Sequence, residues 1–441
     1  MEPRLGSART AAVPKEPATH RSQAPRTALP WVIAGIVVMA LSLRAPIVAP
    51  TAVIGDIRAD TGLSAVGAGL LTGLPVFLFA VATPLATRTI RRFGPEATVL
   101  LCLAGVLAGT VIRSTGPSAV VMAGTALIGV AMTLGNIVVP VLIRRDVPWN
   151  RVSGATGAYS ATMNVGSMAV LLGTAPLAGL VGWRWAIAAW GVVTAAGLAY
   201  WLVRVRRRAA AGTADATDGA DPGTPAASAA GTQPANGPGG PGATSAAGRT
   251  DADAARTRRI LTLLVLTFCG QSSAYYATTA WLPLLLSETR GLAPTGSGAV
   301  ASLFQIAAVV GALGVPVLAA RTRAWVPMAV IAAFWIALPI GLLAAPELYV
   351  LWSIAGGIAQ GGGFTAIFSI IPRIARSNAE AASASARVQG SGYLAATVAP
   401  PLAGWLNTAT GGWTAPLLLV LAATLAFTIG GLLASRLAGR T

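Results

Sequence analysis

The residue of this sequence with the most informative chemistry is Arg44, an arginine inside a long apolar stretch. It lies in "LPWVIAGIVVMALSLRAPIVAP", residues 29–50, which contains no other charged side chain. Arginine stays protonated in proteins, and its planar guanidinium suits carboxylate-like or linear anions. A charge at the bilayer centre costs about 2.5–3.5 kcal/mol on insertion scales, so it must face a cavity or a partner. Arg44 is therefore our candidate for the positive pole of an anion-binding site.

Two other interpretations of Arg44 stay open at the level of the sequence. Arg44 lies about 20 Å from Trp31 along a helix at 1.5 Å per residue, so its side chain could snorkel to the outer interface. It could instead pair with Asp56 or Asp60, which follow the apolar stretch. Substrate contact is favoured because no carboxylate lies well within any apolar stretch, which leaves Arg44 without an obvious partner at membrane depth.

Neutral polar and aromatic residues in other apolar stretches could complete such a site. Gln271 and Tyr275 share a helix face at a spacing of four residues, with Tyr276 adjacent, and Gln389 and Tyr393 repeat that spacing. For any one of them, an interhelical hydrogen bond worth roughly 0.6 kcal/mol is an equally good explanation. As a set they predict a pocket for a small polar anion or a planar heterocycle. The candidate substrate-binding residues are Arg44, Asn136, Gln271, Tyr275, Tyr276, Gln360, Gln389 and Tyr393.

Histidine and cysteine are sparse and badly placed for metal or redox chemistry. His20, the only histidine, lies in the polar N-terminal stretch, and Cys102 and Cys269 both fall in apolar stretches. We therefore expect no metal site, no disulfide framework and no histidine proton relay. The sequence also shows no HExxH motif, nucleophile elbow, paired carboxylates or P-loop. It indicates neither an enzyme nor an ATP-driven pump, and it predicts no cofactor.

The elements that must carry these residues are transmembrane helices. Of the 441 residues, 54% are hydrophobic and only 10% are charged, which a soluble protein could not accommodate. Apolar stretches of about 20 residues recur, the length that a helix needs to cross a bilayer. We expect an all-α membrane protein with twelve transmembrane helices in two six-helix halves. The predicted spans are 29–50, 64–87, 95–113, 117–143, 152–177, 183–204, 258–286, 297–320, 326–344, 348–372, 381–406 and 412–436.

The positively charged residues are concentrated on one side of the predicted spans. Of the 31 Lys and Arg residues, 25 fall in the two termini and in alternate loops on one side of the predicted spans. This is the positive-inside pattern, so we expect a multi-pass protein of the plasma membrane with both termini in the cytoplasm. The net charge of +17 therefore does not indicate nucleic-acid binding. Arg387 lies within a span, near its cytoplasmic end, and is expected to snorkel. The other side receives only Arg58, Arg113, Arg184 and Arg290.

The chain divides into two comparable halves around a polar segment. That segment is rich in Ala, Gly, Pro, Thr and Asp without a periodic apolar face, and we expect it to be a disordered linker. Residues 129–145 and 357–373 align without gaps, which suggests an internal repeat, although coincidence among Gly- and Ala-rich helices would also explain the match. The predicted organisation is a cytoplasmic tail (1–28), a first half (29–204), the linker (205–257), a second half (258–436) and a cytoplasmic C-terminus (437–441).

The loop after the second span carries the first family resemblance. Its sequence "PLATRTIRRFG", residues 84–94, is similar to the loop signature G-x-L-A-D-R-x-G-R-R of the major facilitator superfamily. The resemblance implies a cytoplasmic gating role for Arg88, Arg91 and Arg92. Thr87 stands where that signature has aspartate, so the usual aspartate-centred ion pairing is not expected here.

A closer resemblance is to the cyanate / 2-nitroimidazole transporter family within that superfamily. It rests on segments in both halves, in the expected order: "LRAP…IRADTGLS" (43–64), "GNIVVPVLIRRDVP" (135–148), "GAYSATMNVG" (157–166), "GQSSAYYATTAWLP" (270–283), "AQGGGF" (359–364) and "VQGSGYLAATVAPPLAG" (388–404). Ser42 departs from it, because the family more often has asparagine there, and Arg387 stands where an apolar residue is expected.

The resemblance implies the major facilitator fold, with the first, fourth, seventh and tenth spans lining a central cavity. It implies a monomeric secondary transporter in contact with membrane lipid, moving a small polar solute such as cyanate or another small anion by alternating access. A co-transported proton would travel with the anion or through Asp56 or Asp146. One alternative is efflux of small drugs or nitroimidazole-like heterocycles. Another is a membrane sensor that transports nothing.

Overall fold

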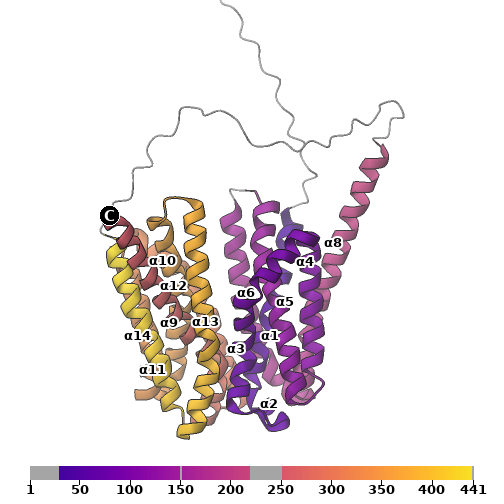
Figure 1. Ribbon diagram of the computed structural model, residues 1–441. Helices are drawn as coiled ribbons and strands as arrows, with labels where there is room; N and C mark the ends of the chain where they lie inside the picture. Colours follow the sequence, from indigo (N-terminus) through magenta and orange to yellow (C-terminus); the bar gives the residue numbers. More distant parts are fainter. Residues whose placement is uncertain (1–28, 149–150, 219–250, 440–441) are drawn as a thin grey trace, which may run out of the picture.

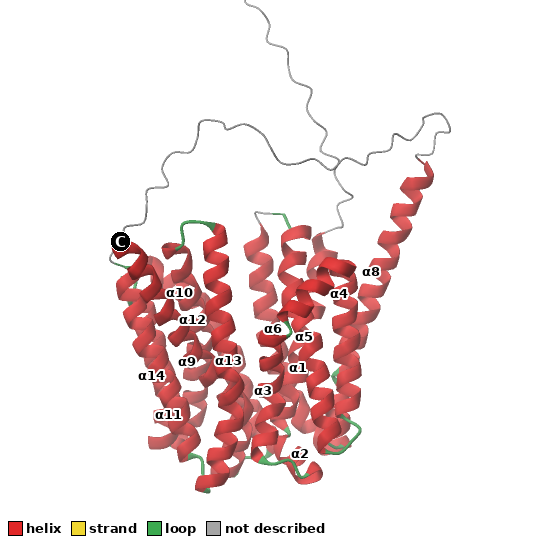
Figure 2. Ribbon diagram, in the orientation of Figure 1, coloured by secondary structure: helices red, strands yellow, loops and turns green. Residues whose placement is uncertain are grey.

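The computed structural model describes residues 29–148, 151–218 and 251–439, and within these ranges the regular elements are helices standing side by side (Figures 1 and 2). The predicted tail 1–28 lies outside the described residues, as do residues 219–250 of the linker and 440–441 of the C-terminus. The first half contains α1 (Leu29–Ala52), α2 (Ile54–Thr61), α3 (Ala65–Val81), α4 (Thr83–Arg113), α5 (Ser118–Asp146), α6 (Val152–Val181), α7 (Trp183–Ala189) and α8 (Gly191–Asp218).

The second half repeats the same plan of long helices. It contains α9 (Asp251–Arg290), α10 (Pro294–Arg321), α11 (Val326–Ala344), the short 3-10 helix η2 (Pro346–Leu348), α12 (Tyr349–Ile374), α13 (Asn378–Thr410) and α14 (Thr414–Ala438). Ten described helical segments are long and apolar enough to cross a membrane, and one of them joins α7 and α8 into a single span. The shorter apolar α3 and the 33-residue α13 bring the described spans to the predicted twelve.

The helices extend further into the predicted linker than composition suggested. α8 continues to Asp218 and α9 begins at Asp251, so both ends of the 205–257 segment are helical. The reason is local propensity: "RVRRRAAAG" after residue 203 and "DADAARTRR" before Ile260 are rich in Ala and Arg, which are strong helix formers even without an apolar face.

Polar caps and glycines with positive φ set several helix boundaries. Ser64 caps α3 by accepting from the amide of Gly67 at 3.1 Å, and Ser377 caps α13 by accepting from that of Glu380 at 3.1 Å. Gly94 (φ 80°) bends α4 between its exposed first segment and its membrane span, and Gly182 (φ 81°) separates α6 from α7. A side chain at these two positive φ values would be strained.

The two halves meet along α3 with α13 and along α6 with α10. The closest approaches use glycines: an ideal Cβ on Gly73 would lie 2.6 Å from the carbonyl oxygen of Thr397, and one on Gly298 would lie 2.8 Å from that of Leu171. The Gly298 contact falls in the first part of α10 and in the later part of α6, away from the linker, and the Gly73 contact lies at the middle of α3 and in the later part of α13. In Figure 1 the ribbons of α6 and α13 diverge toward the linker end of the bundle.

Candidate functional site

Arg44 joins the two halves at the middle of the bundle. Its Nη1 donates to the hydroxyl of Tyr275 in α9 at 3.3 Å, and its buried Nε has no hydrogen-bond partner among the described residues. Its electrostatic neighbours are four tyrosines: Tyr275, Tyr276, Tyr159 and Tyr393. The guanidinium therefore points into the protein toward the second half, and in this structure Arg44 does not snorkel to the outer interface.

The two carboxylates that follow α1, those of Asp56 and Asp60, do not pair with Arg44. Asp60 accepts from Arg184 at 2.8 Å and from the indole of Trp183 at 3.1 Å, and Asp56 is exposed. In the part of the chain that the structure describes, Arg44 forms no salt bridge, so the pairing with Asp56 or Asp60 that the sequence left open is not formed. Arg44 is a cation whose electrostatic neighbours are neutral tyrosines, with the hydroxyl of Tyr275 in direct contact, and this arrangement attracts an anion.

Stacked rings hold the tyrosines of α9 in place. The ring of Tyr275 stacks on that of Phe304 from α10, with centroids 6.2 Å apart and planes 16° apart. Tyr276 meets the edge of Tyr275 at 4.8 Å. Both tyrosines are less than a tenth exposed. Packing on both sides thus fixes the hydroxyl of Tyr275 beside Arg44, and aromatic pairs of this kind contribute about 0.5–1.5 kcal/mol beyond their buried area.

An aromatic cluster, which the sequence did not reveal as a unit, continues from Tyr393. Tyr393 in α13 contacts the edges of Phe79 from α3 and Phe268 from α9, at 6.3 and 5.7 Å between centroids. Phe268 in turn meets Phe368 at 5.4 Å and Phe364 at 6.0 Å, both from α12. One signal was available: Phe268, with Gln271 and Tyr275, lies at i, i+3 and i+7 on one face of α9.

Three consecutive glycines orient α12. Ideal Cβ atoms on Gly361, Gly362 and Gly363 would collide with α10, α11 and α9, respectively. The remaining face of this turn carries Gln360 and Phe364, since residues of a helix are about 100° apart, and Phe364 is 44% exposed. The buried Oε1 of Gln360 has no hydrogen-bond partner among the described residues. It is an acceptor available to a ligand or water.

The other predicted polar residues are Gln271, which makes structural hydrogen bonds, and Asn136 and Gln389, which make none within the described ranges. Gln271 accepts from the indole Nε1 of Trp335 at 2.6 Å and donates from Nε2 to the backbone oxygen of Gln360 at 2.8 Å, so it ties α9 to α11 and α12. Asn136 in α5 and Gln389 in α13 are half-buried and make no side-chain hydrogen bond within the described ranges. The structure thus groups Arg44 with the tyrosines and uses Gln271 as an interhelical tie.

The predicted gating arginines lie at the linker end of the bundle. Arg88, Arg91 and Arg92 are exposed on the first segment of α4, and Arg92 stacks on the ring of Phe93 at 5.3 Å. Beyond the Gly94 bend, an ion-pair network that sequence reasoning missed connects three helices. Its members are Glu96 in α4, Arg145 and Asp146 in α5, and Arg204 in α8.

Two further arginines qualify the sequence predictions. Arg387 is exposed in the early part of α13, close to the linker end as expected. Arg113 was counted among the charges of the other side, at the end of the predicted span 95–113, but the structure buries it as the last residue of α4 with 1% exposure. The reason is tertiary: its Nη1 donates to the backbone oxygen of Pro46 in α1 at 2.6 Å, a contact that hydropathy cannot reveal.

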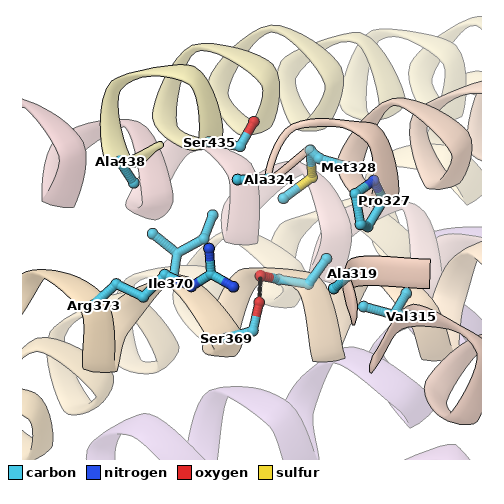
Figure 3. A pocket seen from close by; sticks show the side chains of 11 residues that line it. Val315, Ala319, Ala324, Pro327, Met328, Ser369, Ile370, Arg373, Ser435 and Ala438 are labelled. Carbon is cyan, nitrogen blue, oxygen red and sulfur yellow. Dashed lines mark hydrogen bonds between the residues drawn. The ribbon is translucent and has the colours of Figure 1, made fainter. Parts of the chain in front are cut away.

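A small pocket in the second half has a different character (Figure 3). It lies between α10, α11, α12 and α14, where Arg373 is its one charged lining residue and Ser369 donates to the backbone oxygen of Ala366. Its volume of about 20 Å³ leaves space for about one water. It contains none of the candidate substrate-binding residues, so we do not assign it to the solute.

Solved structures of transporters resemble this chain throughout its length. A peptide transporter POT in complex with sulfate matches with a TM-score of 0.68 and 13% identity, covering 93% of this chain and 95% of that one. A bacterial homologue of the human lysosomal transporter Spinster, inward-facing and unoccupied, matches with a TM-score of 0.66 and 15% identity, covering 92% and 97%. At these identities the likeness shows the fold alone.

Sequence relatives and the family profile agree with the fold. The chain is 31% identical over 406 residues to the uncharacterized transporter YycB of Bacillus subtilis (strain 168), covering 91% of this chain and 92% of YycB. It is also 31% identical over 415 residues to the 2-nitroimidazole transporter of Escherichia coli (strain K12), covering 92% and 95%. The Major Facilitator Superfamily profile matches residues 31–354. The chain is therefore a multi-pass membrane transporter of small solutes that belongs to the major facilitator superfamily, as its sequence motifs predicted.

Proposed function

We propose that this transporter carries a small polar anion across the plasma membrane by alternating access, with Arg44 as the charged contact for the solute. The observation that carries the proposal is the neutral environment of Arg44: four tyrosines surround it, and no described carboxylate pairs with it. An entering anion would receive the charge-assisted hydrogen bonds that the guanidinium does not make to described protein atoms. Cyanate and small carboxylates carry the required charge.

The distribution of contacts between the halves supports an inward-facing state. The halves touch at the end away from the linker and diverge at the linker end (Figure 1). The positive-inside pattern favours a cytoplasmic position for the linker and both termini. In the proposed cycle the bundle closes at the linker end and opens at the other, and one chain forms the complete pathway.

A second candidate solute is a planar nitro-heterocycle. The specific observation in its favour is the aromatic cluster of Tyr393, Phe268, Phe364 and Phe368, whose partly exposed Phe364 offers a face for ring stacking. The related Escherichia coli protein is named a 2-nitroimidazole transporter. A nitro group would accept from Arg44 in the way a carboxylate does, so both candidates use the same contact.

The deciding experiment is uptake into proteoliposomes with labelled cyanate, acetate, nitrate, 2-nitroimidazole and imidazole at two imposed pH gradients. We expect saturable uptake of an anion or of the nitro compound, and background uptake of imidazole. Dependence on the gradient would indicate a co-transported proton. Preference for a neutral or cationic solute without a nitro group would refute the proposal.

The variant Arg44→Gln tests the assigned contact, with the exposed Arg387→Gln as the matched control. Arg44→Gln should lose transport while Arg387→Gln keeps it, and both should elute as folded monomers in detergent. Normal transport by folded Arg44→Gln would remove Arg44 from the site.

A further inference from the structure

Helix α1 lacks two of its backbone hydrogen bonds, one on each side of Arg44. Proline has no N–H, so Pro46 cannot donate to the carbonyl of Ser42, and Pro50 cannot donate to that of Pro46. Arg44 lies between these two free carbonyls. The helix is therefore weakest at the turn that carries the proposed solute contact.

Arg113 replaces one of the missing donors. Its Nη1 lies 2.6 Å from the carbonyl oxygen of Pro46, the group that Pro50 leaves unpaired. The side chain is 1% exposed, and its Nε and Nη2 have no hydrogen-bond partner among the described residues. A buried cation with a single partner is costly, so stability alone gives a poor account of an arginine at this position.

Arg113 approaches α1 from the side opposite to Arg44. Residues two apart on a helix are about 200° apart, so Pro46 lies nearly opposite Arg44 on α1. Arg113 therefore contacts the back of α1, while Arg44 reaches forward to Tyr275. The space beside Arg113, next to Ile187 and Trp190, has a volume of about 0 Å³ for water. This packing excludes a second anion site there.

We propose that Arg113 is a positioning residue: by binding the free carbonyl of Pro46, it fixes the turn of α1 that directs Arg44 toward the solute. The proposal rests on the proposed role of Arg44. It assigns to Arg113 an effect on solute affinity although Arg113 does not touch the solute.

The test is a double-mutant cycle between Arg113→Met and Pro50→Ala. Alanine at position 50 supplies a backbone N–H that can donate to the carbonyl of Pro46, which makes Arg113 dispensable. Arg113→Met alone should raise KM for the transported anion, measured first with labelled cyanate, by about tenfold, the effect of one lost charged hydrogen bond. The double variant should recover most of that loss, and Arg113→Lys, which keeps one cationic donor, should fall between.

A second readout does not require a known substrate. Hydrogen–deuterium exchange of the peptide spanning residues 47–53 should be faster in Arg113→Met and return to normal in the double variant. The matched control is Arg184→Met, since Arg184 also binds backbone oxygens at this end of the bundle, those of Ser114 and Gly116, and donates no hydrogen bond to α1 among the described residues. It should leave both exchange in this peptide and KM unchanged.

The outcomes separate this proposal from the proposed function. Unchanged exchange in folded Arg113→Met, or faster exchange with unchanged KM, would overturn the positioning role. If Pro50→Ala fails to rescue Arg113→Met, the carbonyl of Pro46 is not the group through which Arg113 acts. If folded Arg44→Gln transports normally, the anion site itself is refuted, whatever the exchange data show.

Discussion

Arg44 in the first half donates to the hydroxyl of Tyr275 in the second half, so the candidate site spans the interface between the halves, which would move relative to each other in the proposed alternating access. A contact of this kind can change with conformation, because its two members are carried by different helix bundles. A solute between them would bind most strongly when both halves contribute.

The hydroxyl of Tyr275 should contribute to solute affinity. Tyr275→Phe keeps the ring stacked on Phe304 and removes only the oxygen that Arg44 contacts. We expect KM for the anion to rise about fivefold, the effect of losing about 1 kcal/mol of hydrogen bonding, with little change in thermal stability. Tyr349→Phe, at the start of α12, is the matched control and should behave as the parent. An equal KM in both variants would contradict a role for this hydroxyl.

Gln271 should matter for stability. Gln271→Leu leaves the buried indole N–H of Trp335 without its acceptor, which should cost about 1–3 kcal/mol and lower the melting temperature in detergent. Gln389→Leu removes a half-buried glutamine without such a bond and should change the melting temperature little. Should Gln271→Leu melt normally and alter solute selectivity instead, Gln271 would be a substrate contact rather than an interhelical tie.

Gly73 should control how closely the two halves approach along α3 and α13. Its Cβ position lies 2.6 Å from the backbone oxygen of Thr397, so Gly73→Val should push the halves apart there and favour closure at the linker end. Spin labels at Gly157 in α6 and Gly390 in α13, where nothing lies within 4 Å of an added Cβ, should then move closer together. Gly179→Val, also without near neighbours, is the control, and an unchanged distance in Gly73→Val would refute this prediction.

The pair of Arg204 and Asp146 should stabilise the first half. Their side chains are 9% and 7% exposed and 2.9 Å apart. Asp146→Asn removes the carboxylate that pairs with the buried guanidinium of Arg204, which should destabilise the protein by about 3 kcal/mol. Thermal unfolding of Asp146→Asn against the exposed Asp56→Asn measures the difference. Equal melting temperatures would show that the network contributes nothing to stability.

The sequence by itself determined the number of spans, their approximate limits and the superfamily, because a bilayer imposes length and hydropathy on each helix independently of its neighbours. It also singled out Arg44, since a charge within an apolar span is conspicuous without any knowledge of contacts. The prediction from composition was less accurate at the linker. There the Ala- and Arg-rich ends continue as helices up to Asp218 and from Asp251.

Only the tertiary structure decided what each polar residue touches. Gln271 and Tyr275 share a helix face and looked equivalent in sequence, yet one ties α9 to two neighbours while the other reaches Arg44 across the interface. Arg113 looked like loop charge and is buried against Pro46. Helical periodicity gives the face on which a side chain lies, but which helix packs against that face depends on contacts between residues far apart in the chain.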